Sequence, residues 1–279
     1  MGKITLVKLL EKIKEMPPLP QSVTQVLEIS KSTKSSAQDL AKVFERDPAL
    51  AANILKIANS SFYGFTRRIS SITHAIVCLG LDTVKSIALT SSTQEMLSNE
   101  IPAYDLEKGM LLQHSITCAT CARIIAQRIG YKDCEEAYTA GLLLDIGKVI
   151  LSRFAEDQFN QIIEKTKDNK TPFNIAEQEV LGFDHPRIGG RIIKKWNLPP
   201  ALIEAVQYHH QPEKAETNKT LTYIVHFADA ISDMLGIGLG SDGLMYVLEE
   251  NTLDILGLSK EDMESIMSEL VDKIQSMEQ

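Results

Sequence analysis

The chain has 279 residues, 44% of them hydrophobic and 24% charged, which is enough apolar content to bury a sizeable core. The formal net charge of −8 argues against a nucleic-acid-binding surface, because phosphate contacts need clustered basic residues. Four cysteines are too few for a disulfide framework, no apolar run reaches the roughly 18 residues of a membrane span, and the charged N-terminus is unlike a signal peptide. We therefore expect a cytoplasmic protein that does not contact a membrane.

The first predicted elements are amphipathic helices. Apolar residues recur with helical spacing over residues 6–13, and the prolines of "MPPLP" end that helix because proline cannot continue a helix interior. Ser36 and Asp39 have the spacing of a capping box at the start of the next helix. Asp47 followed by Pro48 is a second start signal, which opens the helix "ALAANILKIAN".

Helices also dominate the rest of the chain. The stretches "SSITHAIVCLG", "LDTVKSIALTSSTQEML" and "LLQHSITCATCARIIAQRIG" have helical periodicity, and a last helix follows Ser259. Alternating apolar and polar runs bounded by turn residues do not recur, so strands are not expected. The predicted fold is all-α, a two-lobed helical bundle. We expect an N-terminal lobe over 1–105, a second helical lobe over 106–235, and a C-terminal loop with helices over 236–279.

Cys118 and Cys121 form the one CxxC of the sequence. A zinc knuckle would need a second pair of cysteines. The spacing of three residues places both thiols on one face of an apolar helix, so we interpret them as buried core residues.

Polar side chains that could bind a metal are dispersed over five predicted helices. Imidazole and carboxylate groups that converge inside a helical bundle favour a divalent transition metal, namely iron, manganese or zinc, over magnesium or calcium. The candidate ligands are His114, Asp145, His185, His209, His210 and Asp229.

These residues carry a resemblance to a known family. The stretches "HSITCATCARIIAQ", "AYTAGLLLDIGKVIL", "FDHPRIGGRIIKKWNLP", "AVQYHH" and "ADAISD" resemble the helical core of the HD superfamily of metal-dependent phosphohydrolases. The N-terminal stretches "MPPLPQSVTQVLEIS" and "DPALAANILKIANSSFYG" resemble the HDOD domain, a branch that is taken to act as a signalling output module. The resemblance runs from about Met16 to beyond His210 and implies an HD-like core in the second lobe.

Position by position, the resemblance gives each candidate ligand a counterpart. His114 matches the first HD-type histidine, and Asp229 matches the closing aspartate. Leu144 and Asp145 match the HD pair, with leucine in place of its histidine. His185 matches the histidine that HD-GYP phosphodiesterases place after this pair, and His209 with His210 match their paired histidines. The HHExxDGxGYP motif of those enzymes is absent, because Gln211-Pro212-Glu213 follows His210.

Two functions follow from the resemblance. Loss of one central metal ligand to Leu144 favours a non-catalytic regulatory module that acts through contact with a signalling protein partner, with a degenerate metal pocket. The alternative is a residual metal-dependent phosphohydrolase or phosphodiesterase, since the other matched positions still hold histidine or aspartate. A third interpretation treats the histidines as core residues satisfied by hydrogen bonds, without a metal. Homodimerisation is left open.

Four further residues are weaker candidates. Lys148, which follows the "DIG" stretch, would reach a substrate phosphate in an HD enzyme; it could equally pair with a nearby carboxylate or lie in solvent. Asn59, Phe62 and Tyr63 end a helix of the N-terminal lobe with two aromatic side chains close to a turn, and are candidates for partner contact. Alternatively, the aromatic side chains of Phe62 and Tyr63 fill a seam between the lobes.

Overall fold

The computed structural model describes residues 6–30, 36–60, 63–65, 68–154, 156–169, 171–241 and 248–278. These residues form helices joined by turns. The β-type pairing among them is limited to an isolated antiparallel bridge between Ile101 and Leu106. The predicted all-α fold is confirmed. None of the described helices is by itself long and apolar enough to cross a membrane; Ile72–Leu79 and Leu81–Leu97 reach that length only as a pair, bent by 115°.

The chain divides into two compact units. One contains residues 18–95 and 271–279, and the other contains residues 1–17 and 96–270. The lobe boundaries at residues 105 and 235, which we inferred from the sequence, stay a prediction.

The smaller unit is built from short helices whose starts are capped as the sequence predicts. Ser36 and Asp39 form the expected capping box, and Asp47 caps the helix that begins at Pro48. Its elements are α2 (Gln21–Ser30), α3 (Ala37–Phe44), α4 (Pro48–Ala58), α5 (Ile72–Leu79) and most of α6 (Leu81–Leu97).

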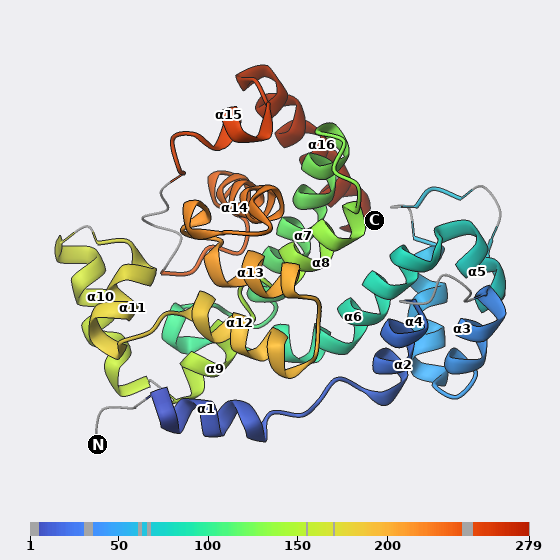
Figure 1. Cartoon of the computed structure of the whole chain (residues 1–279), viewed down its shortest axis with the longest axis horizontal. Helices are drawn as coiled ribbons and strands as arrows, with labels where there is room; N and C mark the ends of the chain where they lie inside the picture. The colour runs from blue at the N-terminus through green and yellow to red at the C-terminus, as the bar shows by residue number, and fades with distance from the viewer. Residues whose placement is uncertain are drawn as a thin grey trace. The chain divides into compact units, whose positions relative to one another are not determined.

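The larger unit holds all six candidate metal ligands (Figure 1). Its elements are α1 (Leu6–Glu15), η1 (Pro102–Tyr104), α7 (Met110–Arg128), α8 (Cys134–Leu143), α9 (Ile146–Phe154), α10 (Glu156–Asn169), α11 (Phe173–Leu181), α12 (His185–Lys195), α13 (Pro200–Tyr208), η2 (Pro212–Lys214), α14 (Lys219–Met234), α15 (Thr252–Leu256) and most of α16 (Lys260–Glu278).

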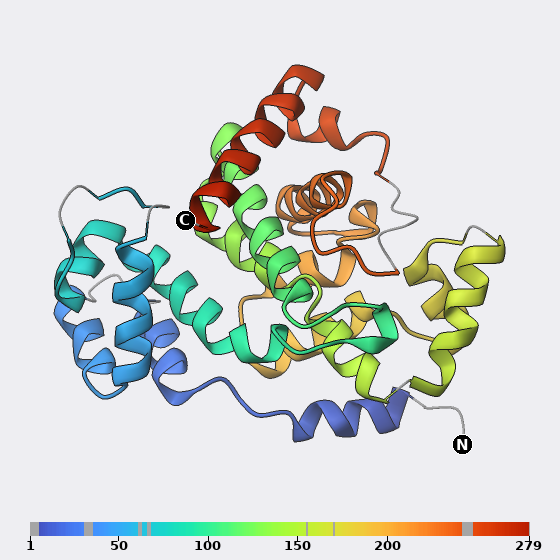
Figure 2. The ribbon, with the colours of Figure 1, turned by 180° about the vertical axis from the view of Figure 1, so that it is seen from behind.

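Helix α7 is the central element of the larger unit. It is buried around most of its circumference and packs against α8 and α14. Figure 2 shows α16 running alongside it, and Arg128 at the end of α7 donates hydrogen bonds to Asp262 and Ser265 of α16. Gly141 lets α8 approach closely, because a Cβ at this position would lie 2.7 Å from the carbonyl oxygen of Cys118. A buried helix of this kind can present polar side chains only to an internal site.

Candidate metal centre

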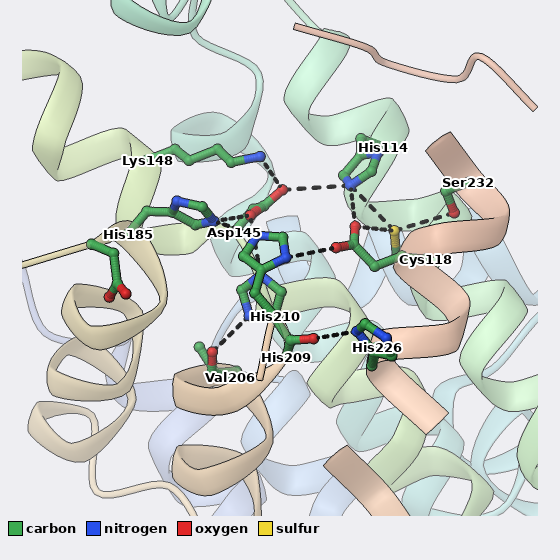
Figure 3. A network of polar contacts seen from close by, with 12 residues as sticks. His114, Cys118, Asp145, Lys148, His185, Val206, His209, His210, His226 and Ser232 are labelled. Atoms are coloured by element: carbon green, nitrogen blue, oxygen red, sulfur yellow. Dashed lines mark hydrogen bonds and ion pairs between the residues drawn. The ribbon is translucent and has the colours of Figure 1, made fainter. Parts of the chain in front are cut away.

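Imidazole and carboxylate groups from five parts of the larger unit converge inside it (Figure 3). His114 lies on α7, Asp145 at the break between α8 and α9, and Asp229 on α14; His185 begins α12, and His209 with His210 follows α13. The sequence reading placed Asp145 within a helix, whereas the chain turns at Leu144 and Asp145 before α9 begins. The break places the carboxylate of Asp145 between His185 and His209 on one side and His114 on the other.

Local structure explains how Asp145 and His185 come together. Asp184 caps α12 by accepting a hydrogen bond from the backbone N–H of Arg187, so that His185 occupies the first position of this helix. Gly147 lets the start of α9 lie against the start of α12, since a Cβ there would lie 2.0 Å from the carbonyl oxygen of His185. The Nε2 atom of His185 thereby comes within 3.3 Å of Oδ1 of Asp145.

The first group, the histidine pocket, consists of His185, His209, His210 and Oδ1 of Asp145. The Nδ1 atom of His185 pairs with Glu177 at 2.8 Å, and that of His209 pairs with the carbonyl oxygen of Val206 at 2.7 Å. These acceptors hold a ring proton on Nδ1, so both Nε2 atoms face the pocket and present a lone pair whenever the ring is neutral. The Nε2 atoms of His185 and His210 are 3.1 Å apart, and Nε2 of His209 lies 3.8 Å from Oδ1 of Asp145.

This pocket contains polar atoms whose partners are missing. Among the described residues, Oδ1 of Asp145 and Nε2 of His209 are buried without a hydrogen-bond partner. An unpaired buried polar atom costs about 1–3 kcal/mol, so a metal ion, a proton or a water molecule between these atoms would stabilise the pocket. Three imidazole nitrogens and a carboxylate oxygen fit a divalent transition metal. Such a metal, when bound, would polarise or ionise a coordinated water or hold the fold together.

The second group, the cysteine pocket, consists of His114, Cys118, Asp229 and Oδ2 of Asp145. The Nε2 atom of His114 is 3.0 Å from Oδ1 of Asp229 and 3.5 Å from Oδ2 of Asp145. The Sγ atom of Cys118 is 3.4 Å from Nε2 of His114 and 3.8 Å from Oδ1 of Asp229. Asp145 therefore joins the two pockets, with one carboxylate oxygen facing each (Figure 3).

Burial and charge set the protonation of these groups. Burial raises the pKa of Cys118 to about 11 and lowers the pKa of His209 to about 4. Burial also disfavours a charge on His185, but Glu177 and Asp145 outweigh it and raise its pKa to about 10. Burial opposes ionisation of Asp145, yet the Lys148 ammonium and the surrounding histidines hold its pKa well below the usual range. His209 is thus a neutral imidazole, the form that binds metals.

Lys148 and Leu144 flank the carboxylate of Asp145. The buried ammonium of Lys148 donates a hydrogen bond to Oδ2 of Asp145 at 2.6 Å. Lys148 therefore pairs with a nearby carboxylate, which is one of the roles considered from the sequence. A phosphate-binding role for Lys148 stays a prediction. The side chain of Leu144 is fully buried.

Sequence reasoning missed three residues of the centre. Cys118 is buried as expected, but its thiol contacts His114 and Asp229 instead of apolar neighbours alone. Glu177 and Tyr104 are fully buried, and the hydroxyl of Tyr104 donates a hydrogen bond to Oε1 of Glu177. The four-residue spacing of His114 and Cys118 on one helix face was the available signal for the thiol.

The weaker candidates of the smaller unit have different surroundings. Asn59 links α4 to the segment that precedes α5: its Nδ2 donates to the carbonyl oxygens of Leu55 and Ile69, and its Oδ1 accepts from the N–H of Ile69. Tyr63 is half-buried and stacks on Phe65. Phe62 lies outside the described residues. Partner contact by these residues stays a prediction.

Comparisons with known proteins agree with this architecture. The model of the HDOD domain family matches residues 16–212. An HDOD domain protein of unknown function from Geobacter sulfurreducens has a solved structure with a TM-score of 0.81 and 24% sequence identity, covering 98% of this chain and 97% of that one.

Two curated relatives are considerably longer. An uncharacterized protein of Treponema pallidum is 23% identical over 221 residues, which are 78% of this chain and 42% of that protein. Ribonuclease Y of Mycoplasma mycoides subsp. mycoides is 29% identical over 155 residues, 55% of this chain and 25% of that enzyme. This chain thus spans less than half the length of either relative. Because the family model covers most of the sequence, the chain belongs to the HDOD domain family.

Proposed function

We propose that this HDOD domain is a non-catalytic regulatory module that acts through contact with a protein partner, and that its metal pockets stabilise the fold. The observation that carries the proposal is the enclosure of the centre. His114, Asp145, His185, His209 and Asp229 are each at most 4% exposed. Catalytic metal sites keep an open position for water and substrate, whereas structural sites are closed. Of the six candidate ligands, His210 alone is partly exposed, at 19% of its side chain.

The residues around Asp145 support the same proposal. At the position where an HD enzyme has its central histidine, the fully buried Leu144 offers no lone pair. The ammonium of Lys148 binds Oδ2 of Asp145, and its positive charge opposes the binding of two divalent cations that share this carboxylate. A two-metal hydrolytic mechanism needs two cations that clamp the reacting phosphate. Leu144 and the Lys148 ammonium therefore both disfavour a two-metal centre in this chain.

A partner surface on the smaller unit is part of the proposal. Val77 on α5 is 69% exposed and Phe65 is 41% exposed, so both apolar side chains are available for contact with a partner. The partner is a signalling protein, as the family resemblance implies.

The alternative function is metal-dependent hydrolysis of a phosphodiester. It is favoured by the similarity to ribonuclease Y and by the imidazole and carboxylate ligands that remain. The two functions differ in turnover. We expect the zinc-, manganese- or iron-loaded protein to hydrolyse RNA, cyclic dinucleotides and nucleotides at below ~10⁻³ s⁻¹, against the usual enzymatic range of about 1–10³ s⁻¹. Turnover near ~1 s⁻¹ that Asp145→Asn abolishes would establish the hydrolase instead.

A further inference from the structure

Cys118 has the position of a metal ligand. It lies one helical turn after His114 on α7, and its side chain is fully buried. Its Sγ atom faces Nε2 of His114 at 3.4 Å and Oδ1 of Asp229 at 3.8 Å, while Nε2 and Oδ1 are 3.0 Å apart. The three donor atoms thus form a compact triangle at the centre of the larger unit.

The size of this triangle fits a tetrahedral metal. Zinc binds thiolate sulfur at about 2.3 Å and imidazole nitrogen or carboxylate oxygen at about 2.0–2.2 Å, so the edges of a tetrahedral site measure roughly 3.3–3.6 Å. The three observed edges bracket this range. Oδ2 of Asp145, 3.5 Å from Nε2 of His114, lies within reach as a fourth ligand.

The contacts of His114 leave a place for either a second ring proton or a metal. Its Nδ1 lies 3.2 Å from the carbonyl oxygen of Ile237, which can only accept a proton. Neutral His114 therefore carries its proton on Nδ1 and turns a lone pair toward the oxygens of Asp229 and Asp145. Gly238, at φ 65°, brings this loop against His114, since a Cβ there would lie 2.7 Å from Cβ of the histidine. In the neutral ring, the Nε2 lone pair of His114 therefore faces carboxylate oxygens, which are also acceptors. A proton or a metal ion between these atoms removes the repulsion.

We propose that Cys118 binds a divalent metal as a thiolate, and that it supplies to the cysteine pocket the ligand that the HD pair lacks at Leu144. His114, Cys118, Asp229 and Asp145 then form a closed site. A thiolate favours zinc, iron(II) or cobalt(II) over magnesium, calcium or manganese. Binding releases the thiol proton to solvent, and the two negative charges of Cys118 and Asp229 balance the dication. This inference deepens the proposed function, because a closed thiolate site is typical of structural metals.

The competing arrangement is a metal-free hydrogen-bond network. Ser232 donates its hydroxyl to the carbonyl oxygen of Ala228, and its oxygen lies 3.2 Å from Sγ of Cys118, where it can accept the thiol proton. In that arrangement a proton on His114 replaces the metal. The two arrangements differ in whether sulfur is bonded to a metal.

Cobalt(II) reports this bond directly, because a thiolate ligand gives an intense near-ultraviolet charge-transfer band that nitrogen and oxygen ligands do not give. The full chain, stripped with chelator, is titrated with cobalt(II) alone. We expect the band to appear at one equivalent or less per chain, to vanish in Cys118→Ser and to persist in Cys121→Ser. Cys121 is the matched control: it lies on the same helix and is equally buried. His209→Ala, in the histidine pocket, should also keep the band.

Absence of the band in the native chain, or its persistence in Cys118→Ser, would overturn the proposal. If Cys118→Ser fails to fold, X-ray absorption of the native zinc-loaded chain decides: a sulfur neighbour at about 2.3 Å supports ligation by Cys118, and a shell of nitrogen and oxygen alone excludes it. A sulfur shell that remains in Cys118→Ala would assign the bond to another cysteine and overturn the proposal too. Hydrolytic turnover is measured separately, so a failure of the proposed function and a failure of this inference give different results.

Discussion

Glu177 binds His185 twice through a single oxygen. Its Oε2 atom accepts a hydrogen bond from the backbone N–H of His185 at 2.9 Å and from its Nδ1–H at 2.8 Å, and both residues are fully buried. Tyr104 donates its hydroxyl to the other carboxylate oxygen. Carboxylates that accept the distal ring proton of a ligating histidine fix its tautomer and strengthen its binding to the metal. Glu177 is thus a positioning residue for the histidine pocket.

The substitution Glu177→Gln tests this role. The amide weakens the charge-assisted bond to Nδ1 and can place an N–H donor against it, so the ring of His185 loses its fixed tautomer. We expect zinc affinity, measured by competition with a chromophoric chelator, to fall about 10–100-fold. Circular dichroism should remain helical.

Tyr104→Phe is the control for Glu177→Gln, because it removes the hydroxyl while keeping Glu177 beside His185. It should change zinc affinity much less than Glu177→Gln does. Equal affinities for Glu177→Gln and the native chain, with a lowered melting temperature, would make Glu177 a structural residue without influence on the metal.

The substitution Leu144→His restores the histidine of the HD pair. Leu144 is fully buried directly before Asp145, so an imidazole there has no solvent to satisfy it and gains most from a metal. We expect more metal per purified chain, measured by inductively coupled plasma mass spectrometry, and less in Asp145→Ala.

Leu143→His is the matched control for Leu144→His, since Leu143 is equally buried one residue earlier. It should destabilise the fold without adding metal. A gain of metal in both variants would show that any buried imidazole in this region recruits an ion, and no gain in either would make Leu144 an ordinary packing residue.

The sequence predicts the helices and the candidate metal ligands for different reasons. Helices are local: the Ser36 box and the Asp47 cap depend on residues three positions apart, and the structure has both. The matched HD positions identified the candidate ligands, which come from five parts of the larger unit. How His114 meets Asp229 could be anticipated only through that resemblance, because 115 residues separate them.

The residues that sequence reasoning missed act through tertiary contacts. Glu177 lies 73 residues from Tyr104, and no spacing along the chain indicates that the two side chains meet. Cys118 was interpreted as a core residue because its helix is apolar, and burial alone agrees with that. Its proximity to Asp229 depends on how α14 crosses α7, which periodicity cannot specify.

Asn59 should prove more important for stability than for partner contact. Its amide group makes three hydrogen bonds, two of them to the backbone of Ile69, so Asn59→Ala leaves those backbone groups without their partner. We expect a loss of about 1–3 kcal/mol in the free energy of unfolding, measured by urea denaturation. Phe65→Ala, at a position 41% exposed, should cost less. The opposite ranking would indicate that the Asn59 bonds contribute little and that Phe65 is a packing residue.

Gly147 sets the distance between the two sides of the histidine pocket. A Cβ at this position would lie 2.0 Å from the carbonyl oxygen of His185 and 2.9 Å from the backbone nitrogen of Gly189. Both are backbone atoms, which cannot rotate away as a side chain can, so Gly147→Ala must push α9 from α12. Because Asp145 precedes α9 and His185 begins α12, the same displacement separates their ligand atoms. We expect a loss of at least about 1–3 kcal/mol in stability together with weaker zinc binding.

Gly190→Ala provides the matched control, since Gly190 is a buried helix glycine on α12, the helix that Gly147 of α9 approaches. A Cβ there would lie 3.1 Å from Cβ and 3.2 Å from Oε1 of Gln207, so α13 needs to move by only a few tenths of an ångström, far less than the 2.0 Å contact at Gly147 demands. Alanine is also favoured over glycine in a helix by about 0.8–1.0 kcal/mol, which offsets the tighter contact. Thermal denaturation and zinc titration of both variants should therefore show a large effect at Gly147 and a small one at Gly190. If Gly147→Ala retained native stability and zinc affinity, α9 and α12 would not need this close approach, and the pocket would owe its geometry to the caps and hydrogen bonds of His185 alone.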